Sequence, residues 1–348
     1  MSLSLGIVGL PNVGKSTLFN AITNLQVEAA NYPFATIEPN IGVVAVPDAR
    51  LDKLAAIEKS KKSVNTVIEF KDIAGLVAGA AQGEGLGNQF LSHIREVDAI
   101  VEVVRFFADD NIIHVAGHVD PKRDVETIET ELALADLQLV EKKLENLKKS
   151  AKSGQHEDIV KAGLAQKLFD ALASGKLANM VKLPEEEEKY LFEFPLLTRK
   201  PIMYVANIKS GETAPENYLA LDAQIESEIS QLPEGERETY LKELGLAESG
   251  LDRLIREAYK TLGLRTFFTA GEQEARAWTI TAGDKAPQAA GKIHTDFEKG
   301  FIKADVVAYD RFVEAGGWTG AREKGWARSE GKDYVVADGD VVLFKFSV

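Results

Sequence analysis

The chain has 348 residues, of which 45% are hydrophobic and 27% are charged, and its formal net charge is −13. This length predicts two or three domains, and the composition excludes a disordered or fibrous protein. The absence of cysteine excludes disulfides, thiolate nucleophiles, iron–sulfur clusters and cysteine-bound zinc. The longest stretch without Asp, Glu, Lys or Arg is residues 1–14, too short to span a membrane, so we expect a cytoplasmic protein without a membrane partner.

Apolar runs of β-forming residues alternate with helical segments in the first hundred residues, which predicts an α/β fold. A fifth apolar run, residues 201–207, follows the fourth only after roughly 95 residues, although a βαβ unit needs about 30. An insertion therefore separates the fourth and fifth strands. The first four predicted strands are residues 5–10, 41–46, 64–70 and 99–107.

The expected insertion, residues 121–194, has apolar residues at helical spacing over residues 131–144 and again over residues 157–173. Two antiparallel helices joined near Ser153 and Gly154 are the simplest interpretation. Five lysines lie within residues 142–152. Such a charge run is most often a solvated helix end, and contact with nucleic-acid phosphates is the alternative.

A second domain is expected from residue 263 to residue 348, after a helix at residues 250–262. Three strands and a short helix predict an α+β fold there. Asp338-Gly339 is typical of a hairpin turn between Val335-Val336 and the pair Val341-Val342. The first domain then comprises nucleotide-binding segments 1–120 and 195–262 around the insertion. The expected strands are residues 265–280, 301–309 and 334–346, and the expected helix is residues 293–299.

Residues 9–16 read Gly-Leu-Pro-Asn-Val-Gly-Lys-Ser and match the phosphate-binding pattern G-x-x-x-x-G-K-[ST] between a predicted strand and a predicted helix at residues 17–23. Backbone amides of such a loop surround the phosphates, Lys15 reaches the β and γ phosphates, and the Ser16 hydroxyl binds Mg²⁺. We therefore expect nucleotide contacts from Asn12, Val13, Gly14, Lys15, Ser16 and Thr17.

Two further segments predict nucleotide-sensing switches. Asp72-Ile-Ala-Gly75 follows a predicted strand, where Asp72 can hold a Mg²⁺-bound water and the Gly75 amide can contact the γ phosphate. Thr36 lies in a polar loop between this segment and the phosphate-binding loop, and its hydroxyl can bind Mg²⁺. Each motif alone is weak, but their spacing after a phosphate-binding loop favours a switch protein.

Taken together, the motifs resemble those of the Obg-like ATPases, and within them the bacterial YchF proteins. This resemblance implies a P-loop G domain with a helical insertion, a C-terminal TGS domain of β-grasp fold, ATP hydrolysis with Mg²⁺, and association with ribosomes and ribosomal RNA. We expect the protein to be a monomer. The segments that carry the resemblance are residues 31–40, 72–88, 111–117 and 286–302.

The position after Gly75, where many P-loop GTPases place a water-orienting glutamine, holds Leu76. An apolar side chain cannot orient water, so hydrolysis is slow or another group acts. The resemblance implies that this group is His114, and imidazole can position or deprotonate water; a structural histidine is the alternative. Asn12 resembles the asparagine of K⁺-activated P-loop enzymes, which suggests K⁺ as an activator.

The base-binding segment reads Asn207-Ile208-Lys209-Ser210, without the aspartate of the guanine-binding pattern N-K-x-D. Asn207 can bond a purine and Ile208 can flank its ring, in agreement with the ATP preference that the resemblance implies. Ser210 replaces an acidic residue usual in the family, and the stretch from Ser210 to Asp222 is shorter than expected.

Three functions stay open at this point. The first is an ATPase switch whose nucleotide state gates ribosome binding. The second is a ribosome- or RNA-binding module in which nucleotide is mainly a structural ligand. The third is a GTPase translation factor, which differs from the first through residues 207–210.

Overall fold

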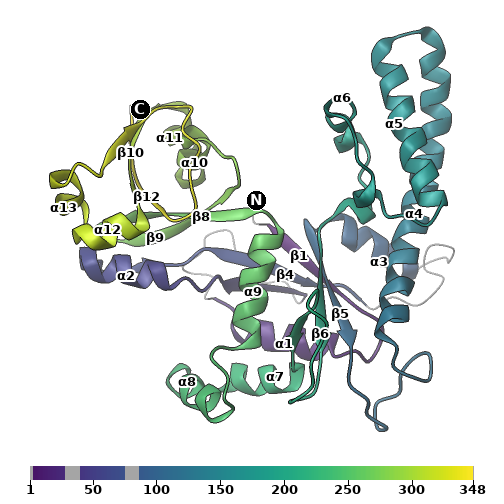
Figure 1. The fold of residues 1–348 in the computed structure, drawn as a ribbon, viewed down its shortest axis with the longest axis horizontal. Coiled ribbons are helices and arrows are strands. Elements are labelled where there is room, and N and C mark those ends of the chain that lie inside the picture. Colours follow the sequence, from purple (N-terminus) through teal and green to yellow (C-terminus); the bar gives the residue numbers. More distant parts are fainter. Residues whose placement is uncertain (1–2, 28–39, 75–85, 348) are drawn as a thin grey trace.

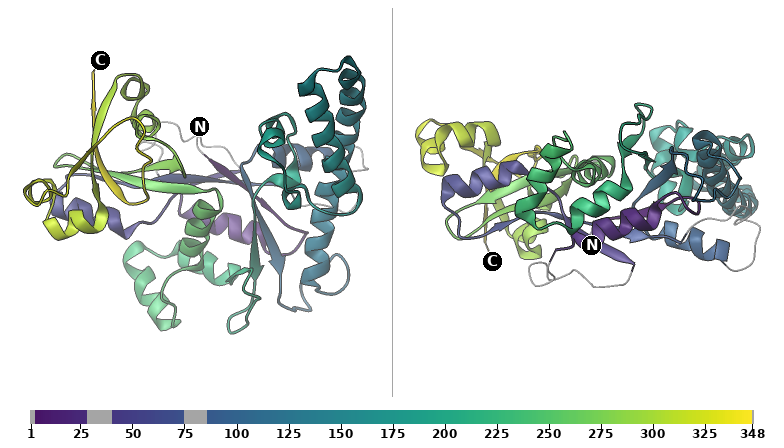
Figure 2. Two further views of the ribbon diagram at one scale, coloured as in Figure 1. Left: turned by 45° about the horizontal axis from the view of Figure 1, so that its top comes forward. Right: turned by 90° about the horizontal axis from the view of Figure 1, so that it is seen from below.

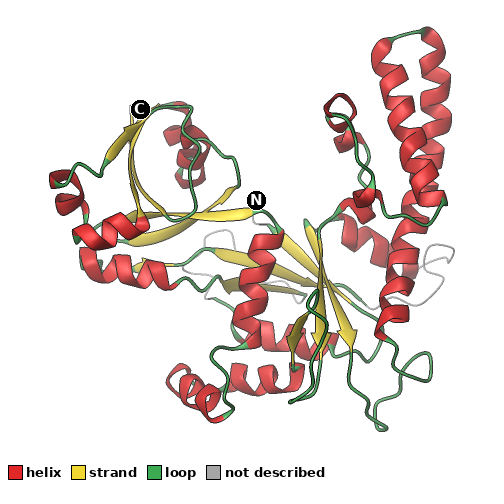
Figure 3. Ribbon diagram, in the orientation of Figure 1, coloured by secondary structure: helices red, strands yellow, loops and turns green. Residues whose placement is uncertain are grey.

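The computed structural model describes residues 3–27, 40–74 and 86–347, and their strands form two six-stranded sheets. The first sheet lies in the middle of the molecule with helices around it (Figures 1 and 3). The helical insertion and the second sheet lie at opposite ends, as the further views also show (Figure 2). Within the described residues, no helix has the length and apolar character needed to cross a membrane.

The first sheet has the strand order β2-β4-β1-β5-β6-β7, and every neighbouring pair is parallel except β2 with β4. All seven residues of β5 are buried, as expected where helices cover both faces of a parallel sheet. The five parallel strands β4, β1, β5, β6 and β7 therefore end at the same edge. The strands are β1 (Ser4–Val8), β2 (Ile41–Ala45), β4 (Val67–Asp72), β5 (Ala99–Arg105), β6 (Ile202–Asn207) and β7 (Leu219–Leu221).

Helices around the first sheet bury their apolar faces in one continuous core. Leu18 and Ile22 of α1, Ile94 of α3, and Leu254 and Ile255 of α9 are all fully buried or nearly so. Such burial is the main favourable term in folding. The helices are α1 (Lys15–Asn24), α3 (Leu86–Arg95), α7 (Ala223–Gln231), α8 (Glu234–Glu243) and α9 (Gly250–Thr261).

The insertion is a helical hairpin with its own apolar core, as the sequence predicts. Helix α4 (Pro121–Ser150) starts at the first sheet, where Ile128 and Leu132 join the central core, and α5 (His156–Ala173) returns along it. Gly154 takes a positive φ of 79° in the turn between them. Short helical turns lead back to β6: Ala178–Met180, α6 (Glu185–Glu188), Leu191–Glu193 and Leu197–Arg199.

A buried aspartate fixes the end of this return path. Asp136 of α4 accepts hydrogen bonds from the backbone nitrogens of Leu197 and Thr198, both at 2.8 Å, and from the Thr198 hydroxyl at 2.7 Å. These bonds satisfy a carboxyl group that burial would otherwise penalise. The insertion and the start of β6 are therefore tied together.

The second sheet has the strand order β11-β10-β12-β8-β9-β3 and is largely antiparallel. Strand β12 is parallel to β8, and β3 is parallel to β9. Its strands are β3 (Ser63–Val64), β8 (Leu264–Ala270), β9 (Ala275–Thr281), β10 (Phe301–Ala308), β11 (Arg328–Glu330) and β12 (Asp340–Phe346). Its helices are α10 (Ala286–Ile293), α11 (Thr295–Lys299), α12 (Tyr309–Ala315) and α13 (Trp318–Glu323).

The predicted hairpin around Asp338-Gly339 is wrong, although the turn itself is present. Gly339 has a φ of 86°, but β12 pairs with β10 and β8, and Val335 only bridges Lys285. The turn instead contacts β8, since Asp338 Oδ1 accepts the Thr266 amide at 2.8 Å. Pairing between distant strands has overridden the local turn signal.

The predicted strand at residues 64–70 is also two strands in different sheets. Strand β3 pairs with β9 of the second sheet, whereas β4 lies in the first. Helix α2 (Ala49–Glu58) precedes β3, and its Leu51 and Leu54 pack in one cluster with Phe268. Residues 49–64 therefore pack with the C-terminal unit, which the sequence does not anticipate.

Candidate functional site

The loop between β1 and α1 needs glycine at two positions. Gly14 has a φ of 97°, and a Cβ there would lie 2.2 Å from Asn207 Nδ2. A Cβ on Gly9 would lie 2.7 Å from the Val103 carbonyl oxygen. Glycine at both positions lets the loop backbone pass close to its neighbours, and the loop amides lie at the start of α1.

Lys15 and Asp72 are brought together at the edge where the parallel strands end. Lys15 begins α1, Asp72 ends β4, and Ile7 of β1 lies opposite Asp72 in the parallel register. Lys15 Nζ forms an ion pair with Asp72 Oδ1, with side chains 11% and 24% exposed. The exposed Ser16 follows Lys15 at the start of the same helix. A hydroxyl and a carboxylate at one loop are hard oxygen donors of the kind that Mg²⁺ prefers.

Two predicted site residues, Thr36 and Gly75, lie outside the described residues, as does Leu76. Their roles stay predictions. Among the described residues, the Asn40 carbonyl accepts the Asp72 amide at 2.9 Å.

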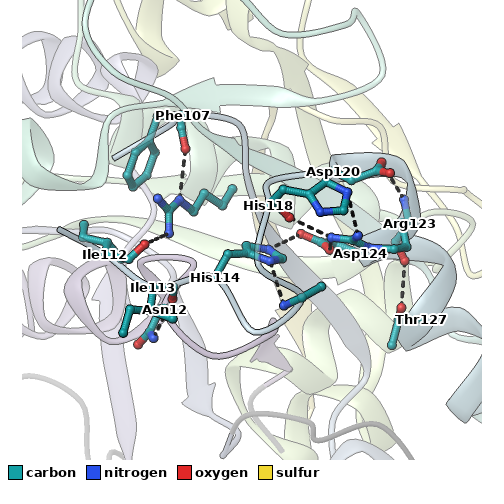
Figure 4. A network of polar contacts seen from close by, with 12 residues as sticks. Asn12, Phe107, Ile112, Ile113, His114, His118, Asp120, Arg123, Asp124 and Thr127 are labelled. Atoms are coloured by element: carbon teal, nitrogen blue, oxygen red, sulfur yellow. Dashed lines mark hydrogen bonds and ion pairs between the residues drawn. The ribbon is translucent and has the colours of Figure 1, made fainter. Parts of the chain in front are cut away.

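His114 is buried, and its ring points toward α4 (Figure 4). Its Nε2 lies 2.8 Å from Asp124 Oδ2, and its Nδ1 accepts the Ala116 amide at 3.2 Å. Because Nδ1 is an acceptor, the ring hydrogen is on Nε2, which donates to Asp124. Both ring nitrogens are thus engaged within the protein.

The segment before His114 contacts the phosphate-binding loop. Asn12, which has a φ of 64°, donates from Nδ2 to the Ile113 carbonyl at 3.0 Å. Buried Arg105 at the end of β5 supports this segment, with bonds to the carbonyls of Phe107 and Ile112 at 3.0 Å and of Asp109 at 3.2 Å. The guanidinium thereby donates hydrogen bonds to three backbone carbonyls that lie outside any strand or helix.

Asn207 ties the phosphate-binding loop to the base-binding segment. It is 4% exposed, donates from Nδ2 to the Val13 carbonyl at 2.9 Å, and accepts the Ala223 amide at 3.0 Å. One Nδ2 hydrogen remains for another acceptor. The structure therefore places Asn207 beside the predicted loop, with most of its bonding capacity used within the protein.

A cavity of about 420 Å³ adjoins Ile208, the residue after β6, and is lined by residues of β7, α7 and α9. At its wall, Asp222 Oδ1 accepts the amides of Gln224 and Ile225 at 3.0 and 3.2 Å, and Oδ2 accepts the Ser210 amide at 3.1 Å. Each carboxylate oxygen therefore already accepts at least one backbone amide. The cavity is lined by Ser210, Ala220, Leu221, Ile225, Glu226, Leu244 and Arg253, among others.

Comparisons with known proteins identify the family of the chain. A model described as "50S ribosome-binding GTPase" matches residues 4–146, and the YchF-GTPase_C model, described as "Protein of unknown function (DUF933)", matches residues 264–347. The chain is 53% identical over 366 residues to "Ribosome-binding ATPase YchF" of Bacillus subtilis, with all of both chains covered. The chain belongs to the YchF family.

Other members of the YchF family show the same full-length similarity. The Haemophilus influenzae relative, also named "Ribosome-binding ATPase YchF", is 51% identical and fully covered. The solved structure titled "Structure of the Schizosaccharomyces pombe YchF GTPase" has 38% identity and a TM-score of 0.87, covering 99% of this chain and 98% of that one. The predicted P-loop G domain with a helical insertion and a C-terminal α+β domain is confirmed.

Three residues of this site were not predicted from the sequence of this YchF family member: Arg105, Asp124 and Asp222. Arg105 is the charged end of an otherwise largely apolar strand, and Asp222 precedes a helix as N-cap residues do, so each left a weak local signal. Asp124 left none, because its partner His114 is ten residues away on a different element.

Proposed function

We propose that this chain is an ATP-hydrolysing switch protein that binds ribosomes and couples its nucleotide state to that binding. The observation that carries the proposal is the pairing of Lys15 with Asp72 at a glycine-lined loop in a YchF family chain. Relatives at 50% identity or more are named ribosome-binding ATPases. Ribosomes act in the cytoplasm, which is the compartment we propose.

The nucleotide would lie along the β1–α1 loop. Backbone amides from Asn12 to Thr17 surround the phosphates in this proposal, and Lys15 turns from Asp72 to the β and γ phosphates. Ser16, Asp72 and the undescribed Thr36 would hold Mg²⁺, Asp72 through water. When bound, Mg²⁺ neutralises charge on the phosphates. The Gly75 amide would contact the γ phosphate.

Relatives' names disagree about the nucleotide, since the bacterial proteins are named ATPases and the yeast structure is titled a GTPase. We propose ATP for this chain. A guanine needs a free carboxylate opposite its N1 and N2 groups, but Ser210 offers none and both oxygens of Asp222 already accept amides. Asn207, with one free hydrogen, and Ile208 beside the cavity suit an adenine.

We assign the positioning of water to His114, which becomes the catalytic residue once its ring faces the nucleotide. Support comes from the Ile113–Asn12 contact, which places the neighbouring residue against the phosphate-binding loop. Asn12 also supports K⁺ activation, because its amide nitrogen is used by Ile113 and its oxygen is the atom that a cation would bind.

The helical hairpin offers a surface for ribosomal RNA. Lys142, Lys148, Lys149 and Lys152 are exposed at its far end, at the tip of a chain whose net charge is −13. A local basic cluster is what an acidic protein needs to meet a phosphate backbone.

The test is nucleotide hydrolysis by the purified protein, with ATP and GTP compared in K⁺ and in Na⁺, with and without ribosomes. We expect ATP turnover that ribosomes and K⁺ raise, and co-sedimentation with ribosomes that differs between ATP and ADP. Equal sedimentation in both nucleotides, without turnover, would instead favour a binding module with a structural nucleotide. Equal use of GTP would overturn the base assignment.

A further inference from the structure

The contact between His114 and Asp124 joins the candidate catalytic loop to the helical insertion. Asp124 lies in the first turn of α4, whose N-cap Asp120 accepts the Arg123 amide at 3.1 Å. Arg123 braces the loop from the other side, with bonds to the His118 carbonyl at 2.8 Å and His118 Nε2 at 3.0 Å (Figure 4). The first turn of α4 thus contacts the loop at two positions, His114 and His118.

The described arrangement leaves His114 unable to act on water. Nδ1 accepts the Ala116 amide and Nε2–H donates to Asp124, so the ring has no free lone pair for a proton. The side chains of His114 and Asp124 are 3% and 4% exposed, so bulk water is excluded from the pair. A general base must lie within hydrogen-bond reach of the water that it activates.

The same loop is nevertheless placed for catalysis. Ile113, the residue before His114, bonds Asn12 of the phosphate-binding loop through its carbonyl. Gly117, with a φ of 81°, closes a turn by donating to the His114 carbonyl at 2.9 Å. Turning the ring away from α4 therefore needs a local change within a short turn, not a displacement of the loop from the nucleotide site.

We propose that Asp124 is a positioning residue that holds His114 in this inactive orientation, and that movement of α4 releases the ring to the nucleotide. The proposal rests on the proposed function and specifies how its activity is regulated. Helix α4 runs unbroken from Asp124 to Ser150 beside the exposed lysines. Contact of a ribosome with the hairpin tip would thus reach Asp124 through one rigid element.

The decisive comparison is steady-state ATP hydrolysis without ribosomes by the wild type, Asp124→Ala and Asp124→Asn. Loss of the carboxylate should raise kcat roughly tenfold, within the usual range of coupling between sites, with KM unchanged and ribosome stimulation reduced by the same factor. Asn retains an oxygen that accepts from Nε2–H, so Asp124→Asn should restore the low rate. Asp124→Ser replaces Asp124→Ala if the latter does not fold.

Two controls separate positioning from a structural effect. Thr127 lies one turn further along α4, where its hydroxyl donates to the Arg123 carbonyl at 2.8 Å, and Thr127→Ala should leave kcat unchanged. NMR of the histidine ring nitrogens should show the Nε2–H form in the wild type and its loss in Asp124→Ala. The double variant with His114→Ala should not hydrolyse ATP.

Each failure has its own signature. Absence of turnover in the wild type under every condition overturns the proposed function and this regulation with it. An active His114→Ala variant removes the histidine from the reaction. Turnover that depends on His114 but is unchanged or slower in Asp124→Ala overturns the role of Asp124 alone.

Discussion

The two sheets of this protein differ in where their strands end, and this difference decides which one holds the site. In the first sheet, β1, β4, β5 and β6 are parallel, so the phosphate-binding loop, Asp72, the His114 segment and Asn207 meet at one edge. This edge is where open α/β sheets bind ligands. In the second sheet, antiparallel neighbours send successive loops to opposite edges. The second sheet thus forms a separate unit, which segment α2–β3 of the N-terminal part of the chain joins.

The largest effect is expected from a substitution that destabilises the second sheet. It tests whether the first sheet stays folded without the second. Phe268 is fully buried among Leu51 and Leu54 of α2, so Phe268→Ala should cost about 3–5 kcal/mol of unfolding free energy. All three tryptophans lie beyond residue 263, so urea unfolding followed by tryptophan fluorescence reports on this unit. ATP binding should persist where that fluorescence transition is complete. Phe192→Ala, at an 81% exposed site, is the control.

Loss of ATP binding together with the fluorescence transition would contradict this view, because it would show one cooperative unit. The packing of α2 against Phe268 would then transmit unfolding from the second sheet to the switch strands β2 and β4.

A second change breaks the site in the first sheet without breaking the fold. Lys15→Ala removes the charge expected at the β and γ phosphates and should lower ATP turnover by about 10²–10³-fold, as the loss of one transition-state donor does. Its partner Asp72 is partly exposed, so stability should change by less than about 1 kcal/mol. Turnover assays and melting curves check both. Lys176→Ala, an exposed lysine of the insertion, should alter neither, and wild-type turnover in Lys15→Ala would refute the site.

The same contrast explains what the sequence could and could not predict. The glycines of residues 9–14, Lys15 and Asp72 were predictable because each is fixed by backbone geometry or chemistry within a short motif. The β3 strand was not, since Val64 runs into β4 without a glycine or proline between them, and its partner β9 lies more than two hundred residues away. Asp124 likewise acts through a contact with His114 on a separate element, which no local pattern encodes.

A third prediction concerns a buried carboxyl group in the first sheet. Glu102 of β5 is buried, and its two carboxylate oxygens have no hydrogen-bond partner among the described residues. Burial, with Glu129 and Asp124 nearby, raises its pKa well above the ordinary value of 4.5. The folded chain thus keeps a proton that the unfolded chain releases. Stability should fall as pH rises from the ordinary value through the raised one.

Glu102→Gln removes this titration and should flatten the pH dependence. Relative to the wild type, the variant should gain about 1 kcal/mol or more between pH 5 and pH 7, since each pH unit within the window is worth up to about 1.4 kcal/mol. Urea midpoints at the two pH values measure this difference. Glu141→Gln, exposed on α4, should show no such gain. An unchanged pH slope in Glu102→Gln would mean that Glu102 is ionised in the folded chain.

The smallest expected effect concerns the charged contact between α2 and the turn before β12 of the second sheet. Arg50 of α2 donates to Asp338 Oδ2 at 2.7 Å, also pairs with Asp48, and lies over the Phe268 ring at 5.1 Å. Because Arg50 and Asp338 are 31% and 46% exposed, Arg50→Ala should cost about 1 kcal/mol or less in the tryptophan-monitored transition, and less in high salt. Lys53→Ala, exposed on the same helix, is the control. A cost equal to that of Phe268→Ala would show that charge, and not apolar packing of α2, holds the second sheet to the first.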